Sequence, residues 1–365
     1  MKFTITKNRF AEAIAKAERI AGKNLSLPVL RCVLIVAQDN VITIRATNLD
    51  LGIEMKLPAT ITTKGTVAIP ADTLHGFLSA LSTQSQVDVE QEGTHVIISS
   101  QKSTTKIASY PHEDFPTLPR VEGGELFKIQ GKEFAQGLKS VWWSATSSSI
   151  KPELSSIYVY SDGDMLVMVA TDSFRLAEKK IHAKKTGAFE SILIPLKNIS
   201  EIIRHSEQGS EISVFGDSYQ IAFHVDDTYI TSRVIDGTFP DYKQIIPGEF
   251  ESEIIALKQD CIDALKHARV FSDQFNKLTI TIDTKEKQVT FNTINAEIGE
   301  ALVSIDAAVS GAPLQMHFNH QYVLDVFSSL TTDSVSFSFS GTGKPMLIKP
   351  VGDASFSYIV MPMNR

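Results

Sequence analysis

Two stretches of the sequence carry residue types that could do chemistry, and both lack part of the pattern that the chemistry needs. The segment SGTGKP (residues 340–345) looks like the end of a phosphate-binding loop. A complete loop of that kind has glycine where Ser338 stands, and serine or threonine where Pro345 stands. His317 and His320 are three residues apart, but no carboxylate or thiol accompanies them at a spacing familiar from metal sites. Neither stretch predicts a nucleotide or metal site.

The composition limits the class of protein. The chain has 365 residues, of which 43% are hydrophobic and 21% charged, which is enough for two or three domains with apolar cores. No run approaches the roughly 18 apolar residues of a membrane helix, and the first ten residues lack an apolar stretch of signal-peptide length. Cys32 and Cys261 have apolar neighbours and no C-x-x-C partner, so we expect both to be reduced core residues of a cytosolic protein. The net charge of −7 argues against simple attraction to nucleic acid, although it leaves room for a locally basic surface.

Three amphipathic helices recur along the chain. The segments RFAEAIAKAERI (9–20), EFAQGLKSVWWS (133–144) and DCIDALKHARVF (260–271) each place apolar residues at i, i+4 and i+7, the spacing of one buried helix stripe. The predicted stripes are Phe10, Ile14 and Ala17; Phe134, Leu138 and Val141; and Cys261, Leu265 and Ala268. Small residues coincide beside these stripes and predict a close approach of the backbone to its neighbours: Ala13, Gly137 and Ala264.

Other landmarks repeat at the same interval. Strand, polar turn and strand recur at 33–48, 157–172 and 278–293, and a second helix recurs within 68–81, 193–205 and 317–330. Phe115 and Phe239 are 124 residues apart, and the independent landmarks give offsets of 122 to 127. We therefore predict an α+β fold of three similar tandem domains, with boundaries at 1–122, 123–250 and 251–365.

The end of the chain is unusually apolar. The last nine residues are SYIVMPMNR (357–365), whereas chain ends are usually polar and mobile. Alternating residues of this segment can belong to a core strand, and Pro362 cannot donate to a strand ladder. Flexible methionines on an exposed apolar surface suit the binding of several different partners. We expect the tail to be a docking surface.

Three similar domains in a row predict an arc, since each would bury similar faces against the next. Heterologous contacts of this kind either close into a ring or continue as a filament. Closure by a second copy gives a ring of six similar domains. Because the helices recur at equivalent positions, they would line the inside of this ring, with the β-sheets outside.

Several motifs together closely resemble the bacterial DNA polymerase III beta subunits, the sliding clamps, over the whole chain. They are SLPVL (26–30), ATDSFRLA (170–177), FPDYKQIIP (239–247), NHQYVLDVF (319–327) and YIVMPM (358–363). The resemblance implies a head-to-tail homodimer that encircles double-stranded DNA without regard to its sequence. It also implies that the ring tethers the DNA polymerase III catalytic subunit, the clamp loader and other replication or repair proteins, with no catalysis and no cofactor or metal of its own. The expected location is cytoplasmic and nucleoid-associated.

The resemblance places a hydrophobic peptide-binding cleft beside the chain end. Arg175 would flank the cleft and offer hydrogen bonds to a peptide. Phe174 stands where the family commonly has histidine, and Gln244 where many members have a basic residue, so the peptide preference is open. The implied cleft residues are Leu154, Thr171, Ser173, Phe174, Arg175, Leu176, Pro240, Gln244, Ile245, Pro345, Met346, Ile359, Val360, Met361, Pro362 and Met363.

A clamp that slides should hold DNA by enclosure rather than by many phosphate contacts, whose strength falls steeply with salt. Only the inner wall then needs to be basic, because the acidic exterior is screened beyond roughly 8 Å at physiological salt. Asn24 occupies a loop position where the family often has a basic residue, and Lys23 can take over that role. The candidates on or beside the repeated helices are Lys16, Lys23, Asn24, Lys139, Lys151, Lys197, Arg204, Lys266 and Arg269.

One alternative function remains open from the residues alone. An enzyme of nucleic-acid metabolism on the same repeated fold, such as a nuclease using Asp and His, would need clustered carboxylates for two metal ions. No such cluster appears in the sequence. Metal-dependent DNA cleavage by the isolated protein would favour this alternative over a clamp.

Overall fold

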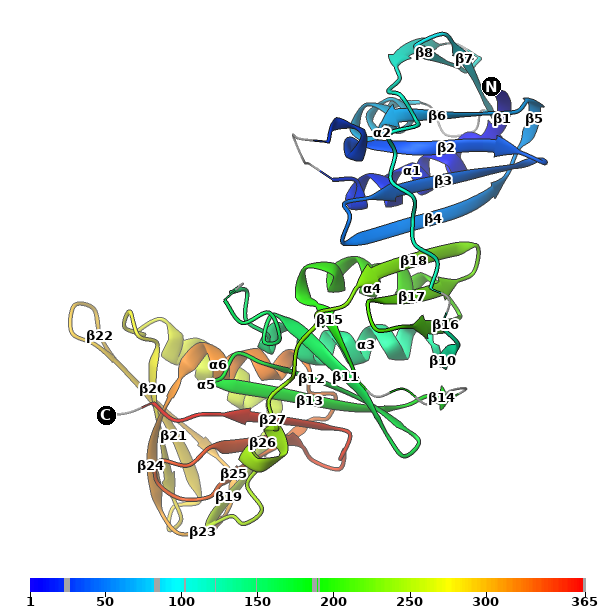
Figure 1. Cartoon of the computed structure of the whole chain (residues 1–365). Coiled ribbons are helices and arrows are strands. Elements are labelled where there is room, and N and C mark those ends of the chain that lie inside the picture. Colours follow the sequence, from blue (N-terminus) through cyan, green and yellow to red (C-terminus); the bar gives the residue numbers. More distant parts are fainter. Residues whose placement is uncertain are drawn as a thin grey trace. The chain divides into compact units, whose positions relative to one another are not determined.

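The computed structural model describes residues 1–22, 27–81, 86–101, 103–121, 123–148, 150–185, 189 and 191–363. It divides into two compact units, each with its own core (Figure 1). Unit 1 comprises Met1–Ala135, Lys184–Ala188 and Lys197–Val234. Unit 2 comprises Gln136–Ala183, Phe189–Leu196 and Ile235–Arg365.

Unit 1 contains two antiparallel sheets. The smaller has the order β5 (Thr60–Thr63), β1 (Lys2–Thr6), β7 (Gln86–Glu92), β8 (His95–Ser99) and β9 (Thr104–Ala108). The larger has nine strands in the order β14 (Lys184–Lys185), β10 (Glu125–Gln130), β16 (Glu211–Gly216), β17 (Gln220–Val225), β18 (Thr228–Arg233), β4 (Leu51–Pro58), β3 (Val41–Thr47), β2 (Cys32–Gln38) and β6 (Gly65–Pro70). Its helices are α1 (Lys7–Ile20), α2 (Ala71–Ala80), α4 (Leu196–Gln208) and the 3-10 helix η1 (Pro28–Arg31).

Unit 2 repeats this plan. Its larger sheet has the order β15 (Ser191–Pro195), β11 (Ser156–Asp162), β12 (Met165–Thr171), β13 (Arg175–His182), β27 (Phe356–Val360), β26 (Met346–Pro350), β25 (Ser334–Phe339), β19 (Ser252–Leu257) and β23 (Ala308–Gly311). Its smaller sheet has the order β22 (Gly299–Asp306), β21 (Gln288–Asn295), β20 (Lys277–Asp283) and β24 (Leu314–Asn319). The helices are α3 (Gly131–Val141), which begins in unit 1, α5 (Lys258–Arg269), α6 (His320–Asp325) and the 3-10 helices η2 (Trp142–Ser144), η3 (Tyr242–Ile245) and η4 (Val326–Ser328).

The predicted helix stripes are the cores of α1, α3 and α5. All nine stripe residues are fully buried, from Phe10 in α1 to Ala268 in α5. The small residue beside each stripe lies where the backbone packs closely against its neighbours. A Cβ atom at Gly137 would come within 2.9 Å of Met168 Sδ, and Ala13 and Ala264 are almost completely buried. The sequence periodicity therefore predicted these helices and their buried faces correctly.

Each larger sheet takes strands from two successive repeats. In unit 1, β4 pairs with β18, with Gly52 opposite Thr231. In unit 2, β13 pairs with β27, with Leu176 opposite Ile359. The compact units consequently do not follow the predicted limits of the repeats, because each unit contains a sheet that joins one repeat to the next.

Both cysteines are buried core residues, as predicted. Cys32 begins β2 and Cys261 lies in α5, and neither side chain is exposed. Burial raises the pKa of each thiol to about 12. Both therefore stay protonated at neutral pH.

A buried carboxylate holds the linker of unit 1 in place. Glu54, on β4, accepts hydrogen bonds from Arg45 Nε at 2.7 Å and from Arg120 Nη2 at 2.5 Å. The Arg120 guanidinium lies 4.6 Å from the centre of the Tyr229 ring, and the Tyr229 hydroxyl donates to the carbonyl of Pro119. Residues 119–121 are thus tied to β3, β4 and β18.

This network predicts a pH-dependent contribution to stability. Burial acts to raise the pKa of Glu54, but the bonds from Arg120 and Arg45 outweigh it, so the pKa lies below its ordinary value. A carboxyl whose pKa is lower in the folded state stabilises above its unfolded pKa, and this stabilisation is lost as the pH falls through the folded pKa. We expect Glu54→Gln to lower the free energy of unfolding by about 1–3 kcal/mol at pH 7, with the deficit shrinking below pH ~4.5.

Urea unfolding followed by circular dichroism at several pH values measures this deficit. Glu90→Gln is the matched control, because Glu90 pairs with Lys2 on the surface of the same unit, where ion pairs contribute little. A Glu54→Gln deficit that is independent of pH would contradict the prediction.

Candidate functional site

A tight turn between β12 and β13 forms one wall of a cleft in unit 2. The Thr171 hydroxyl donates to the carbonyl of Arg175 at 2.7 Å and accepts from the N–H of Ser173. Asp172 Oδ1 accepts from the backbone N–H groups of Phe174 and Arg175. Ser173 has a φ of 79°, a left-handed conformation that the local bonds must hold. The turn is therefore fixed before any ligand arrives.

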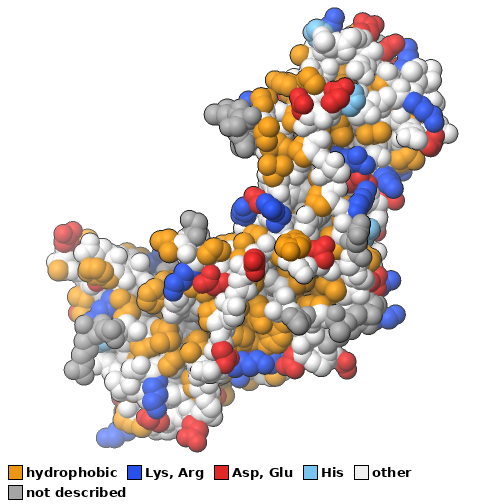
Figure 2. All heavy atoms as spheres, viewed as in Figure 1, with side chains coloured by type: hydrophobic (Ala, Val, Ile, Leu, Met, Phe, Trp, Pro, Cys, Tyr) orange, Lys and Arg blue, Asp and Glu red, His pale blue; other side chains and the backbone are white. Residues whose placement is uncertain are grey.

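The end of the chain forms the second wall. β27 pairs with β13 as far as Val360 opposite Arg175. Beyond the strand, the N–H of Met361 donates to the carbonyl of Phe174 and the N–H of Met363 to that of His317, each at 2.8 Å. Through residue 363 the tail is thus bonded to the turn and to β24. Figure 2 shows hydrophobic side chains gathered on the face of unit 2 over β13 and β27.

The third wall comes from η3 and from the two linker residues before it, Pro240 and Asp241. Together the three walls enclose a cavity of about 130 Å³. Its lining residues are Leu154, Thr171, Ser173, Arg175, Leu176, Pro240, Asp241, Tyr242, Ile245, Ile359 and Met361. Under it lies an apolar cluster that includes Val169, Leu176, Phe239, Leu347 and Ile359. A cleft of this size and composition can take an apolar side chain.

Nine of the sequence-predicted cleft residues line this cavity, and seven do not. Phe174 is 62% exposed beside the turn, and exposed Gln244 donates to Asp241 at 2.7 Å. Val360 and Met346 are opposite each other on β27 and β26 and are fully buried. Pro345, Pro362 and Met363 are half-buried and are not among the lining residues. The sequence analysis missed Asp241 and Tyr242, although both stand in the quoted motif FPDYKQIIP.

Arg175 was expected to offer hydrogen bonds to a bound peptide, but its guanidinium makes most of its hydrogen bonds within the protein. Its guanidinium donates to Asp172 Oδ2 at 2.9 Å, to Asp325 Oδ2 and to the carbonyl of Trp143 at 2.8 Å. It also lies 4.4 Å from the centre of the Tyr322 ring. Only 12% of the side chain is exposed. These contacts make Arg175 a support that joins the turn to α6 and η2, with its stem on the cleft.

Tyr242 is the most deeply placed polar group of the lining. Its hydroxyl donates to Glu178 Oε2 at 2.5 Å and lies 2.7 Å from the Tyr160 hydroxyl. Burial and the hydrogen bond to Glu178 raise its pKa far above the ordinary value, so the phenol stays neutral. The cleft therefore presents no ionised group from Tyr242.

The predicted DNA-facing residues lie on several helices. Lys16 (α1), Lys197 and Arg204 (α4) pair with Glu12, Asp50 and Glu201, respectively. Lys139 at the end of α3, Lys151 in the following turn, and Lys266 and Arg269 on α5 are exposed. Lys23 and Asn24 lie outside the described residues. Arg19, absent from the prediction, joins α1 to α4 through Glu201 at 3.0 Å.

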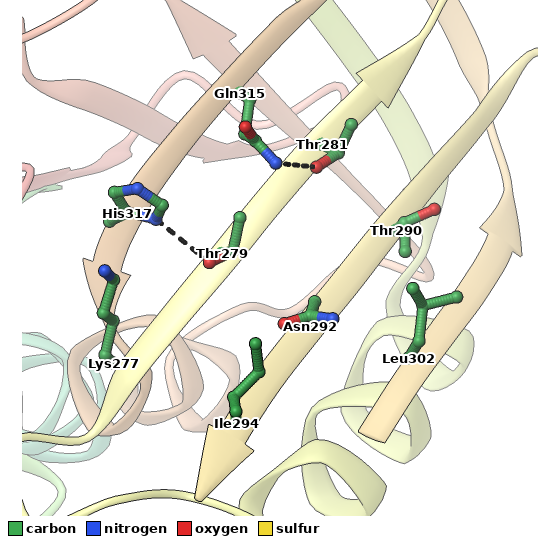
Figure 3. Close-up of a pocket in the computed structure, with 9 residues that line it drawn as sticks. All are labelled: Lys277, Thr279, Thr281, Thr290, Asn292, Ile294, Leu302, Gln315 and His317. Carbon is green, nitrogen blue, oxygen red and sulfur yellow. Dashed lines mark hydrogen bonds between the residues drawn. The ribbon is translucent and has the colours of Figure 1, made fainter. Parts of the chain in front are cut away.

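A wider hollow, of about 630 Å³, lies on the smaller sheet of unit 2 (Figure 3). Gln315 donates to Thr281, and His317 lies 3.0 Å from the Thr279 hydroxyl. The rest of the lining is threonine, asparagine and Lys277, bordered by the apolar Ile294 and Leu302. None of the predicted site residues lines this hollow.

The fragments that imitate catalytic motifs have structural roles. Gly341 and Gly343 have positive φ values in the turn between β25 and β26, and no helix follows as in a phosphate-binding loop. His320 is fully buried, with Nε2 2.7 Å from the carbonyl of Leu265. Among the described residues there is no group of three His, Cys, Asp or Glu side chains that could hold a metal ion. Nor, in that part of the chain, is any helix long and apolar enough to cross a membrane.

Repeated α+β modules that present a small apolar cleft, with no metal-binding cluster among the described residues, are features of a protein that binds partners. Three family models match almost the whole chain: the N-terminal domain of the DNA polymerase III beta subunit at residues 1–119, the central domain at 128–241 and the C-terminal domain at 243–364. The chain belongs to the DNA polymerase III beta subunit family. This confirms the expected three-domain clamp fold, and an accessory subunit rather than an enzyme.

Individual relatives agree with the family. The chain is 25% identical to the beta sliding clamp of Synechococcus elongatus and 24% identical to that of Staphylococcus aureus, covering 100% of this chain and 99% of either relative. Its fold is similar to that of the DNA polymerase III beta subunit of Pseudomonas aeruginosa, with a TM-score of 0.95 at 22% identity over the full length of both chains. It is also similar to a Bartonella birtlesii sliding clamp bound to griselimycin, with a TM-score of 0.94 at 25% identity, again over both full lengths.

Proposed function

We propose that this protein is the processivity factor of a DNA polymerase III: two copies close head to tail into a ring of six domains around duplex DNA. The ring tethers the polymerase, the clamp loader and other replication or repair proteins through the cleft, and it performs no catalysis. The domains are 1–122, 123–250 and 251–365. The protein acts in the cytoplasm, on the nucleoid. The observation that carries the proposal is the cleft between the turn at residues 171–175 and the chain end, in a chain that matches clamp domains over almost its whole length.

The cleft takes short apolar segments of these partners. Its lining offers a flexible methionine and aliphatic side chains from Leu154, Leu176, Ile245 and Ile359. Exposed Phe174 and Gln244 stand beside it, where they would contact the flanks of a bound peptide. Griselimycin, which is bound to similar clamps, is expected to compete with such peptides here.

The second copy docks on β22. This eight-residue strand is the edge of the smaller sheet in unit 2, and an unpaired edge is a template for another strand. Large apolar side chains, each more than half exposed, lie on it or next to it: Leu302 on β22, Ile294 on the neighbouring strand β21 and Ile298 in the turn between them. The smaller sheet of unit 1 also ends in an edge strand, β9. Pairing β22 of one copy with β9 of the next gives the heterologous contact that a closed ring needs.

Retention on DNA tests the proposal. After loading by a clamp loader, the protein is expected to stay many times longer on nicked circular DNA than on a short linear duplex, because it can slide off open ends. Cutting the loaded circle with a restriction enzyme is the control and should release the protein. Equal dissociation rates from circle and linear duplex would refute enclosure.

A further inference from the structure

The repeat places two linker residues at equivalent positions with different neighbours. Leu118 and Tyr242 are 124 residues apart, as are Gly52 and Leu176 on β4 and β13, and Glu54 and Glu178 on the same two strands. The equivalent turns are built alike: the N–H of Arg233 donates to the carbonyl of Asp50 in unit 1, as Met361 does to Phe174 in unit 2. The two junctions can therefore be compared residue by residue.

In unit 1 the linker packs directly onto the sheet. A Cβ atom at Gly52 would lie only 2.6 Å from Cδ2 of Leu118, so the leucine occupies the space that a larger residue on β4 would need. Leu118 is buried. Glu54 accepts its hydrogen bonds from Arg45 and Arg120 rather than from residue 118. Leu118 has no polar group to be held and packs directly against Gly52.

In unit 2 a hydrogen-bond chain holds the equivalent residue in another position. Glu178 is buried, its Oε2 accepts from the Tyr242 hydroxyl, and the Tyr160 hydroxyl completes the chain. Lys180 lies 3.5 Å from the other Glu178 oxygen. The Tyr242 ring packs against Phe239 and borders the cavity together with Leu176 and Ile359. The anchored hydroxyl thus fixes one end of a ring whose face forms the cleft wall.

We propose that Tyr242 is a positioning residue: Glu178 and Tyr160 hold its hydroxyl so that its ring keeps the cleft open for an apolar peptide. This inference rests on the proposed function. Without the tether the ring can tilt into a cavity of about 130 Å³, which is small enough for such a tilt to obstruct it. The Glu178 carboxylate belongs to this support although it does not line the cleft.

Affinity and stability measured in the same set of variants test the proposal. The probes are griselimycin and a fluorescein-labelled peptide derived from the polymerase III catalytic subunit, each titrated against the full-length dimer. We expect Tyr242→Phe to weaken both probes about tenfold, Tyr242→Leu to weaken them at least as much, and Tyr160→Phe to have a smaller effect. Tyr229→Phe is the matched control, because that hydroxyl also bonds to a linker, in unit 1, and Tyr229 does not line the cleft. It should lower the thermal midpoint without changing either affinity.

A double variant separates positioning from general stability. Glu178→Met with Tyr242→Phe removes the buried carboxylate and its phenol donor and leaves only the hydroxyl of the partly exposed Tyr160. No buried charge is then left unpaired, and the thermal midpoint should recover. The affinity for both probes should remain about tenfold weaker than that of the unaltered protein, because the hydrogen bonds that hold the ring at position 242 are still missing. Recovery of affinity together with stability would overturn the proposal, as would unchanged affinity in Tyr242→Phe or an equal loss in Tyr229→Phe. If the unaltered protein bound neither probe, the cleft function itself would fail, which is a distinct result.

Discussion

Replacing Leu302 by aspartate is expected to leave the protein monomeric and to abolish its retention on circular DNA. Leu302 is 65% exposed on the edge strand β22, beside exposed Ile294. In the proposed dimer the new carboxylate would be buried among apolar side chains without a partner, at a cost of several kcal/mol. A cost of about 3 kcal/mol raises the dissociation constant of the dimer more than 100-fold. Analytical ultracentrifugation at several concentrations measures this change.

The monomer itself should remain folded, because Leu302 is mostly solvent-exposed within one chain. The thermal midpoint, extrapolated to low protein concentration, should therefore match that of the unaltered protein. Leu49→Asp is the control: Leu49 is 46% exposed in the turn between β3 and β4 of unit 1 and belongs to neither proposed edge strand. A Leu302→Asp protein that dimerises as tightly as the Leu49→Asp control would disprove the proposed interface.

The second large effect is expected from removing residues 361–365. The truncation deletes Met361 from the cleft lining and both backbone bonds that fix the tail to Phe174 and His317. We expect the affinity for a polymerase-derived peptide to fall more than 100-fold, or about 3 kcal/mol. The truncation removes an apolar wall of the cleft and also the hydrogen bonds that hold this wall in place. Fluorescence anisotropy measures the affinity, and sedimentation should show that the dimer persists.

Two single substitutions locate the effect within the tail. Met361→Ala removes a lining side chain and should weaken binding about tenfold. Met363→Ala is the matched control, because Met363 does not line the cavity and the hydrogen bond from its backbone N–H to the carbonyl of His317 does not depend on the side chain. Peptide affinity that survives the truncation would rule out the tail as a docking surface.

The sequence predicted the local elements well because their signals are local. The i, i+4, i+7 stripe of α1 depends only on Phe10, Ile14 and Ala17 facing the same way, and this spacing can be read without knowing what covers it. The pairing of β13 with β27 joins residues 176 and 359, and a strand pattern does not specify so distant a partner. The shared sheets were therefore beyond prediction, although the repeat itself was not.

The site was predicted in part, through resemblance rather than through pattern. Period-two alternation in β27 already separates Ile359, which lines the cavity, from Val360, which faces the core. Nothing in the linker indicates that the Tyr242 ring turns inward, because its partner Glu178 is 64 residues earlier. The same holds for Arg175, whose partner Asp325 lies 150 residues away. Contacts between segments that are far apart in the sequence decide which residues of a motif line the cleft and which hold the lining residues in place.

The burial of Cys32 and Cys261 has a practical consequence for following this molecule at work. Maleimides and other alkylating reagents attack thiolates at accessible sites, and these two sulfur atoms are neither accessible nor ionised. A cysteine introduced on the surface should therefore take up a fluorophore selectively without prior removal of the native pair. Single-molecule dyes could then be attached to an otherwise unaltered chain.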